Sequence, residues 1–135
     1  MNAKKILIVV IAMVLSFGAA FVYFNNFAHP NKTPEVTYYN YSPGKEFITN
    51  LKGDGKFIKV VVELQVTDPK VLKKLKENTP QIRDAIIQIL RSKTVQEVEG
   101  PQGQEMLKND IKNEINKIIG EGKVVNVYFN DFIVQ

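Results

Sequence analysis

The run PQIRDAIIQILRSKT concentrates more reactive side-chain types than any other helix-like stretch of this sequence. Arg83 and Asp84 are adjacent, so on a helix their side chains diverge by about 100° and cannot act on one substrate atom. Residues 92–94, Ser-Lys-Thr, fall at the C-terminal end of that helix, where no ring of N–H donors is available to hold a phosphate. The run therefore predicts a helix that packs on the rest of the fold and is recognised by a partner. Arg83 and Asp84 are the candidate contacts to that partner.

Other candidates for catalysis are few. Cysteine is absent and histidine occurs once, at His29. This inventory argues against thiolate and imidazole-rich metal sites and against most Ser-His arrangements. Asp131 interrupts an apolar run and is a candidate carboxylate, yet the sequence identifies no histidine, serine elbow or second carboxylate as its partner. We therefore expect no catalytic residue, cofactor or metal site, and a carboxylate-based hydrolase remains the enzyme alternative.

The charge balance argues against a nucleic-acid partner. The net charge is +4, with 18 basic and 14 acidic residues, and binding to phosphates requires clustered Lys and Arg. Two of the basic residues, Lys4 and Lys5, precede the apolar segment, which leaves 16 basic against 14 acidic residues in the rest. That remainder is nearly balanced.

An uncharged segment near the N-terminus predicts a membrane anchor. Ile6–Phe24 contains 19 residues without a charge, and a helix of roughly 20 such residues crosses a bilayer core. Lys4 and Lys5 precede the segment, so residues 1–5 are expected in the cytoplasm and the rest outside it. A cleaved signal peptide is the alternative, although its apolar region is usually only ~7–15 residues long.

Small residues recur inside the anchor. Ala12, Ser16 and Ala20 follow the i, i+4, i+8 spacing that lets two helix backbones approach closely, and lipid-facing filler is the other interpretation. Residues 25–45 are rich in turn-forming residues and predict a linker. The domain is then expected to occupy residues 46–135.

The first part of this domain predicts a β-hairpin. Gly53-Asp54-Gly55 permits positive φ and separates two extended runs, residues 46–52 and 56–67. Apolar side chains alternate along the second run, which is typical of a strand with one buried face. The terminal run, residues 123–135, predicts a long strand that is apolar on both faces.

About three helices are expected between these strands. Asp68-Pro69 and Thr79-Pro80 each predict an N-cap followed by proline, and the first helix should turn Leu72 and Leu75 inward. The second carries a buried stripe of isoleucines, and the third runs from Pro101 to Gly120. Together the elements predict a small α+β domain.

Five parts of the sequence form a recognisable pattern: the single N-terminal span, FITNL before the hairpin, FIKV in the strand after it, IRDAII running on to Leu90 and Ser92 to Thr94, and GKVVNVYFNDFIVQ at the end. Together they resemble the FliL family of flagellar basal-body-associated proteins. None of these is a catalytic motif.

This resemblance implies a non-enzymatic cell-membrane protein, with an N-terminal span and an extracytoplasmic domain similar to stomatin and prohibitin domains. Such domains form rings, and the family ring is thought to surround the MotA/MotB stator units and support torque, swimming and swarming. Ring-forming self-association, the stator and the cell membrane are therefore the expected partners. A general stomatin-like scaffold unrelated to motility is the alternative.

Overall fold

The computed structural model describes residues 2–28, 33–53, 55–120 and 122–135, so His29 lies outside the described residues. It contains two compact units, Met1–Glu35 and Val36–Gln135. In the first unit, α1 spans Ala3–Phe27 and is, among the described residues, the one helix long and apolar enough to cross a membrane. None of its side chains is buried within the structure.

The second unit is an α+β domain, which confirms the expected fold class. Its strands and helices are β1 (Tyr39–Tyr41), β2 (Phe47–Asn50), β3 (Phe57–Val66), α2 (Pro69–Glu77), α3 (Thr79–Ser92), α4 (Val95–Val98), α5 (Gly100–Ile119) and β4 (Asn126–Val134). Strand β1 falls within residues 25–45, the range interpreted from the sequence as a linker.

The sheet is built around β3, the longest strand. Both β1 and β2 pair antiparallel with one side of β3, β1 near its C-terminal end and β2 near its N-terminal end. Strand β4 pairs antiparallel with the other side over almost the whole length of β3. Consequently β1 and β2 form one edge of the sheet, and β4 forms the other.

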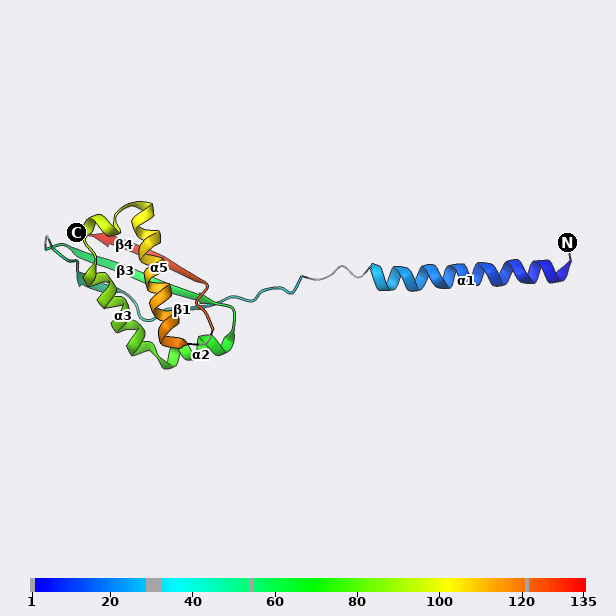
Figure 1. Ribbon diagram of the computed structural model, residues 1–135, viewed down its shortest axis with the longest axis horizontal. Helices are drawn as coiled ribbons and strands as arrows, with labels where there is room; N and C mark the ends of the chain where they lie inside the picture. Colours follow the sequence, from blue (N-terminus) through cyan, green and yellow to red (C-terminus); the bar gives the residue numbers. More distant parts are fainter. Residues whose placement is uncertain (1, 29–32, 54, 121) are drawn as a thin grey trace. The chain divides into compact units, whose positions relative to one another are not determined.

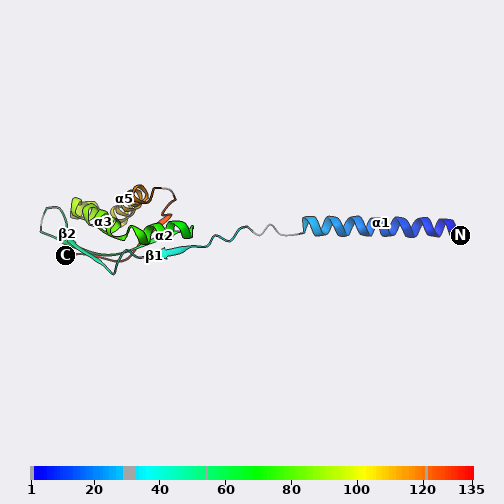
Figure 2. The same ribbon diagram turned by 90° about the horizontal axis from the view of Figure 1, so that it is seen from below.

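The helices cover one face of this sheet. Figures 1 and 2 show α2, α3 and α5 on the same side, with the opposite side left open. Every second residue of β3 is buried beneath them, which confirms the predicted alternation. The core combines Ile58, Val60, Val62, Leu64 and Val66 of β3 with Ile82, Ile86 and Leu90 of α3 and Leu107, Ile111 and Ile115 of α5.

The predicted hairpin is confirmed by the pairing of β2 with β3. Gly53 has φ +81° and Gly55 has φ +62°, in the left-handed region where a Cβ is unfavourable. Asp54, between them, lies outside the described residues. The glycines explain how the chain reverses over so few residues.

The caps of the first two helices differ from each other. Asp68 caps α2 as predicted, since its carboxylate accepts a hydrogen bond from the Lys70 N–H at 2.8 Å. The prediction that Thr79 caps α3 was wrong, because Thr79 is already the first helical residue and Asn78 occupies the cap position. The Thr79 hydroxyl instead hydrogen-bonds to the Lys76 carbonyl at 2.9 Å and to the Tyr41 hydroxyl.

The buried face of α2 includes one residue that the sequence did not single out. Val71 and Leu75 are the buried residues, while Leu72 is half-buried. Residues 71 and 75 are one helical turn apart, so this phase directs both toward the sheet. Leu75 was therefore predicted correctly and Leu72 packs against the core, whereas Val71, the other buried residue, was missed.

A short helix, α4, fills the break between α3 and α5. The Glu97 carboxylate accepts hydrogen bonds from the N–H and the hydroxyl of Thr94, at 2.8 and 3.0 Å. These bonds lower the pKa of Glu97, with Lys93 and Lys52 adding a favourable charge interaction. The sequence contains the matching signal, a threonine followed three residues later by a glutamate.

Strand β4 is not apolar on both faces, so that prediction was wrong. Val62 pairs with Phe129 whereas Val61 pairs with Asp131, which leaves Asn130 as the extra residue of a β-bulge. Because of the bulge, Phe129 and Phe132 lie on the same face, with ring centroids 5.5 Å apart. The open face of β4 consequently carries the polar Asn126 and Asp131 beside Tyr128 and Ile133.

Gly103 of α5 packs against the preceding turn, and substitution there should destabilise the domain. A Cβ at this position would lie 2.8 Å from the Val98 carbonyl carbon and 2.9 Å from the Glu97 oxygen. Both atoms belong to the backbone and cannot rotate away, so Gly103→Ala should lower the free energy of unfolding by about 1–3 kcal/mol. Urea unfolding followed by circular dichroism would measure it. The exposed neighbour Gln102→Ala is the control, and equal stability of the two variants would contradict this packing.

Candidate interaction surface

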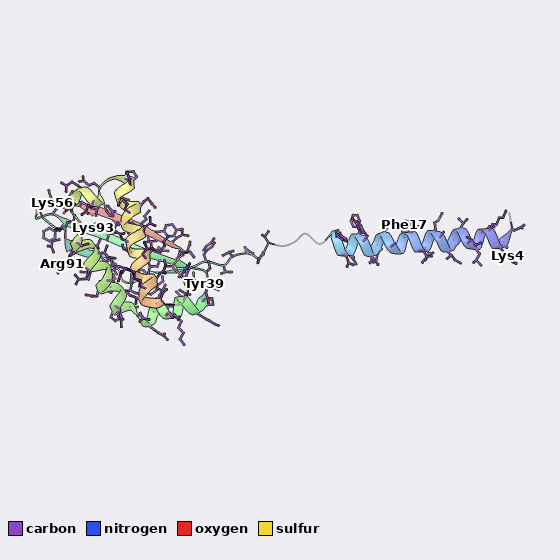
Figure 3. All side chains as sticks on the ribbon, in the orientation of Figure 1. Lys4, Phe17, Tyr39, Lys56, Arg91 and Lys93 are labelled. Atoms are coloured by element: carbon purple, nitrogen blue, oxygen red, sulfur yellow. The ribbon has the colours of Figure 1, made fainter. Side chains whose placement is uncertain are left out.

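The open face of the sheet is the candidate site because it gathers polar and exposed apolar side chains from all four strands. Residues that alternate with the buried ones point to this face. They are Asn40 of β1, Ile48 and Asn50 of β2, Phe57, Lys59, Val61, Glu63 and Gln65 of β3, and Asn126, Tyr128, Asp131 and Ile133 of β4. Tyr39 marks one end of the sheet and Lys56 the other (Figure 3).

A row of amides crosses the face at the end near Tyr39. Asn126 donates to the Gln65 side-chain oxygen at 2.8 Å, and Gln65 in turn donates to the Asn40 side-chain oxygen at 3.1 Å. The Tyr128 hydroxyl also donates to Gln65, at 3.2 Å. The row thus links three strands and has one polarity, with each amide donating toward β1.

Lys59 connects strands in the middle of the face. Its ammonium group lies 3.3 Å from the Glu46 carboxylate and 3.5 Å from the Asp131 carboxylate. These carboxylates, Glu46 first and then Asp131, raise the pKa of Lys59. Ion pairs this exposed contribute only about 0–1 kcal/mol each, so their main effect is to orient the side chains.

Apolar side chains lie exposed at the far end of the face. Ile48 is 63% exposed, Phe57 is 56% exposed and Ile133 is 39% exposed. With Lys59 and Gln135 they line a shallow groove of about 150 Å³. Exposed large apolar residues that cluster in this way are typical of interaction surfaces.

The two α3 residues singled out from the sequence occupy different environments. Arg83 is half-buried, donates to the Pro43 carbonyl at 2.8 Å and places its guanidinium 4.6 Å from the centre of the Phe47 ring. It also packs on Gly44, where a Cβ would clash with it. Arg83 therefore holds the connection between β1 and β2 to α3. Asp84 is exposed.

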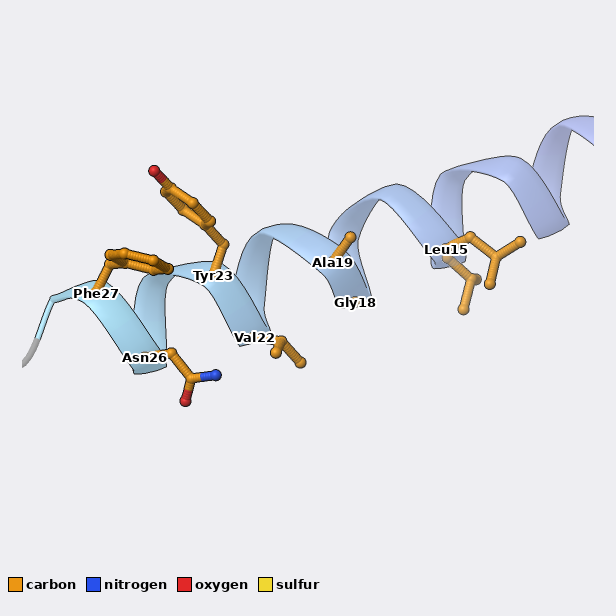
Figure 4. Close-up of a pocket in the computed structure, with 8 residues that line it drawn as sticks. Leu15, Gly18, Ala19, Val22, Tyr23, Asn26 and Phe27 are labelled. Carbon is orange, nitrogen blue, oxygen red and sulfur yellow. The ribbon is translucent and has the colours of Figure 1, made fainter.

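The anchor residues lie along α1, where Ile6 is 48% exposed and Phe24 is 73% exposed. A shallow hollow on this helix is centred on Gly18 and Ala19 and is flanked by bulkier side chains such as Leu15 and Phe27 (Figure 4). Ala12, Ser16 and Ala20 do not line it, and the Ser16 hydroxyl donates to the Met13 carbonyl at 2.9 Å.

The polar groups of the open face are engaged with one another. Asp131 pairs with Lys59, and Glu63 accepts a hydrogen bond from the Asn130 amide at 2.7 Å. In the part of the chain that the structure describes, no group of three or more His, Cys, Asp or Glu side chains gathers as metal ligands would. The polar side chains of the open face therefore hold one another in place, and this arrangement is suited to recognition of another surface.

Sequence reasoning missed the open face itself. Its rows join residues far apart in the chain, such as Asn40, Gln65 and Asn126, which only the strand register brings together. The alternation along β3 was a usable signal, since it predicts that Lys59, Glu63 and Gln65 share the face opposite the core.

These features define an α+β protein with an open sheet face and one apolar helix that fits a single membrane span. A family model described as flagellar basal body-associated protein FliL matches residues 41–135, and the chain belongs to this family. It is 37% identical over 108 residues to the flagellar protein FliL of Aquifex aeolicus (strain VF5), covering 78% of this chain and 67% of that protein. It is 34% identical over 91 residues to the flagellar protein FliL of Bacillus subtilis (strain 168), covering 67% and 64%. The family supports a role associated with the flagellar basal body.

Proposed function

We propose that this chain is a non-enzymatic accessory protein of the flagellar motor that self-associates around the MotA/MotB stator units and supports torque, swimming and swarming. The exposed apolar end of the open sheet face, with Ile48, Phe57 and Ile133, is the observation that carries the proposal, because a surface of this kind favours binding to protein. Membership of the FliL family directs that binding to the basal body.

The same proposal includes a location. Helix α1 crosses the cell membrane once, residues 1–5 lie in the cytoplasm, and the domain lies outside the cytoplasm. Lys4 and Lys5, next to the apolar segment, support this orientation because cytoplasmic flanks carry an excess of basic residues. The domain that follows the linker is thereby kept near membrane-embedded partners.

Removal of the chain from the bacterium that carries it should lower the number of stator units per motor. Fluorescently labelled stators counted in single motors, with torque measured on tethered cells, test this. Restoring the parent chain should restore both quantities. Unchanged stator number and torque without the chain would exclude the motor role and favour a general membrane scaffold.

Asp84→Arg should reduce this restoration if the exposed face of α3 contacts the stator or a second copy. Asn109→Arg, at an exposed position of α5, is the matched control for the added charge. Full restoration by Asp84→Arg would remove Asp84 from the contact. Reversal of Arg83 is unsuitable for this purpose because its intradomain bonds make it part of the fold.

A further inference from the structure

The two edges of the sheet carry matching side chains at matching levels. Asn40 and Asn126 both pair with Gln65, one on each side of β3. Ile48 and Ile133 both pair with Lys59 in the same way. These two rows of the open face therefore begin and end with the same residue type.

A third row has side chains of one chemical class, rather than one residue type, at its two ends. Asn50 pairs with Phe57, and Phe57 exchanges both backbone hydrogen bonds with Gln135, at 2.7 and 2.9 Å. Carboxamide side chains thus stand at both ends of this row. If the β4 edge of one copy met the β1–β2 edge of another at the same level, amide would meet amide and isoleucine would meet isoleucine.

The polarity of the amide row fits such a junction. Asn126 donates to Gln65 and Gln65 donates to Asn40, so the row presents the Asn126 oxygen at one edge and the Asn40 N–H groups at the other. Donor and acceptor would therefore meet at the junction. Ladders of Asn and Gln side chains stabilise stacked strands in this manner.

The backbone has the phase that this junction needs. Because Phe57 and Gln135 bond each other, the antiparallel alternation directs the N–H and C=O of Phe132 and Val134 away from β3. The bond from the Leu51 N–H to the Lys56 carbonyl, at 2.8 Å, likewise directs those of Ile48 away from β3. In a parallel ladder, one residue bonds the two neighbours of its partner.

We propose that copies of this chain join edge to edge, with β4 of one copy parallel to β1 and β2 of the next, Ile133 beside Ile48 and Asn126 beside Asn40. Among the described residues β4 has β3 as its only strand partner, so its outer edge is open to receive a second copy. The contact is head to tail, and such contacts close into rings when the rotation between copies permits. The inference rests on the proposed self-association and specifies its surface.

Disulfide trapping tests the register directly because the chain has no cysteine. Ile48 and Ile133 are separated by β3, which places their Cα atoms about 9–10 Å apart within one copy. A disulfide needs Cα atoms within roughly 7 Å, so a bridge between these positions must join two copies. The full chain, in membranes, would carry Ile48→Cys together with Ile133→Cys.

Mild oxidation of this double variant should produce a ladder of oligomers that reductant abolishes. Each single-cysteine variant should stay monomeric, because the contact sets position 48 against position 133 of another copy. A mixture of the two single variants should stop at dimers. The control pair Ile48→Cys with Met106→Cys combines positions of similar exposure, 63% and 58%, but Met106 lies on α5. This control pair should crosslink about tenfold less than the 48–133 pair, because the proposed junction does not bring the Cα atoms of residues 48 and 106 within ~7 Å of each other.

An amine-reactive crosslinker applied to the parent chain distinguishes failure of the proposed edge from failure of self-association. If the parent is captured as oligomers while the 48–133 pair forms no bridge, the proposed edge is wrong and self-association stands. If single-cysteine variants crosslink as well as the pair, or the control pair does, the register is wrong. A parent that is never captured would overturn both proposals.

Discussion

Two arginines at the centre of α1 are expected to abolish the membrane anchor. Ile6–Phe24 contains 12 Ile, Leu, Val and Phe residues. Each favours insertion by about 0.3–0.6 kcal/mol, which together amounts to about 4–7 kcal/mol. One central arginine opposes insertion by about 2.5–3.5 kcal/mol, so Ile11→Arg with Leu15→Arg should offset the whole preference, whereas one arginine should not.

A reporter fused after Gln135 would measure this outcome. In the parent it should be exposed outside the cytoplasm and remain with the membrane, and in the double-arginine variant it should stay inside. Ile11→Ala with Leu15→Ala is the control and should behave as the parent. A parent reporter inside the cytoplasm would contradict the orientation, and its release as a soluble, shortened protein would favour the signal-peptide alternative.

Leu64→Ala should be among the most destabilising single changes in the domain. Leu64 is 0% exposed, on the central strand beneath the helices. Removal of a buried leucine side chain usually costs about 2–5 kcal/mol, a large part of the ~5–15 kcal/mol that stabilises a typical domain. Urea unfolding of the detergent-solubilised chain, followed by circular dichroism, would measure the loss.

Val61→Ala is the matched control for this change. Val61 lies on the same strand but faces the open side and is half-buried, so its truncation should leave little or no cavity. The loss should therefore be clearly smaller than for Leu64→Ala. Equal losses would show that Val61 is also covered, and that the covering surface lies outside the domain described above.

The parts of the fold that follow from local pattern could be predicted from the sequence. The alternation along β3, the Asp68-Pro69 cap and the apolar stripe of α5 each depend on residues a few positions apart. Strand β1 gave no such signal because it has only 3 residues and is held by its pairing with β3.

The candidate surface could not be predicted because it depends on contacts between distant residues. Arg83 contacts Pro43 and Phe47, which lie on another element, and no helix pattern identifies those partners. The bulge in β4 could not be predicted from the sequence either, since it changes the pairing of β4 with β3 without changing the composition of the strand. Both features decide which side chains remain available to a partner.

The bulge determines where β4 tolerates a change of length. If Asn130 were deleted, Phe129 and Phe132 would still face the helices and Asp131 would still face the open side, because the remaining residues already alternate. Deletion of Tyr128 instead would turn one part of the strand over, exchanging buried for exposed side chains. Insertions and deletions accepted during the divergence of this strand should therefore concentrate at position 130, where they leave the pattern of both sheet edges unchanged.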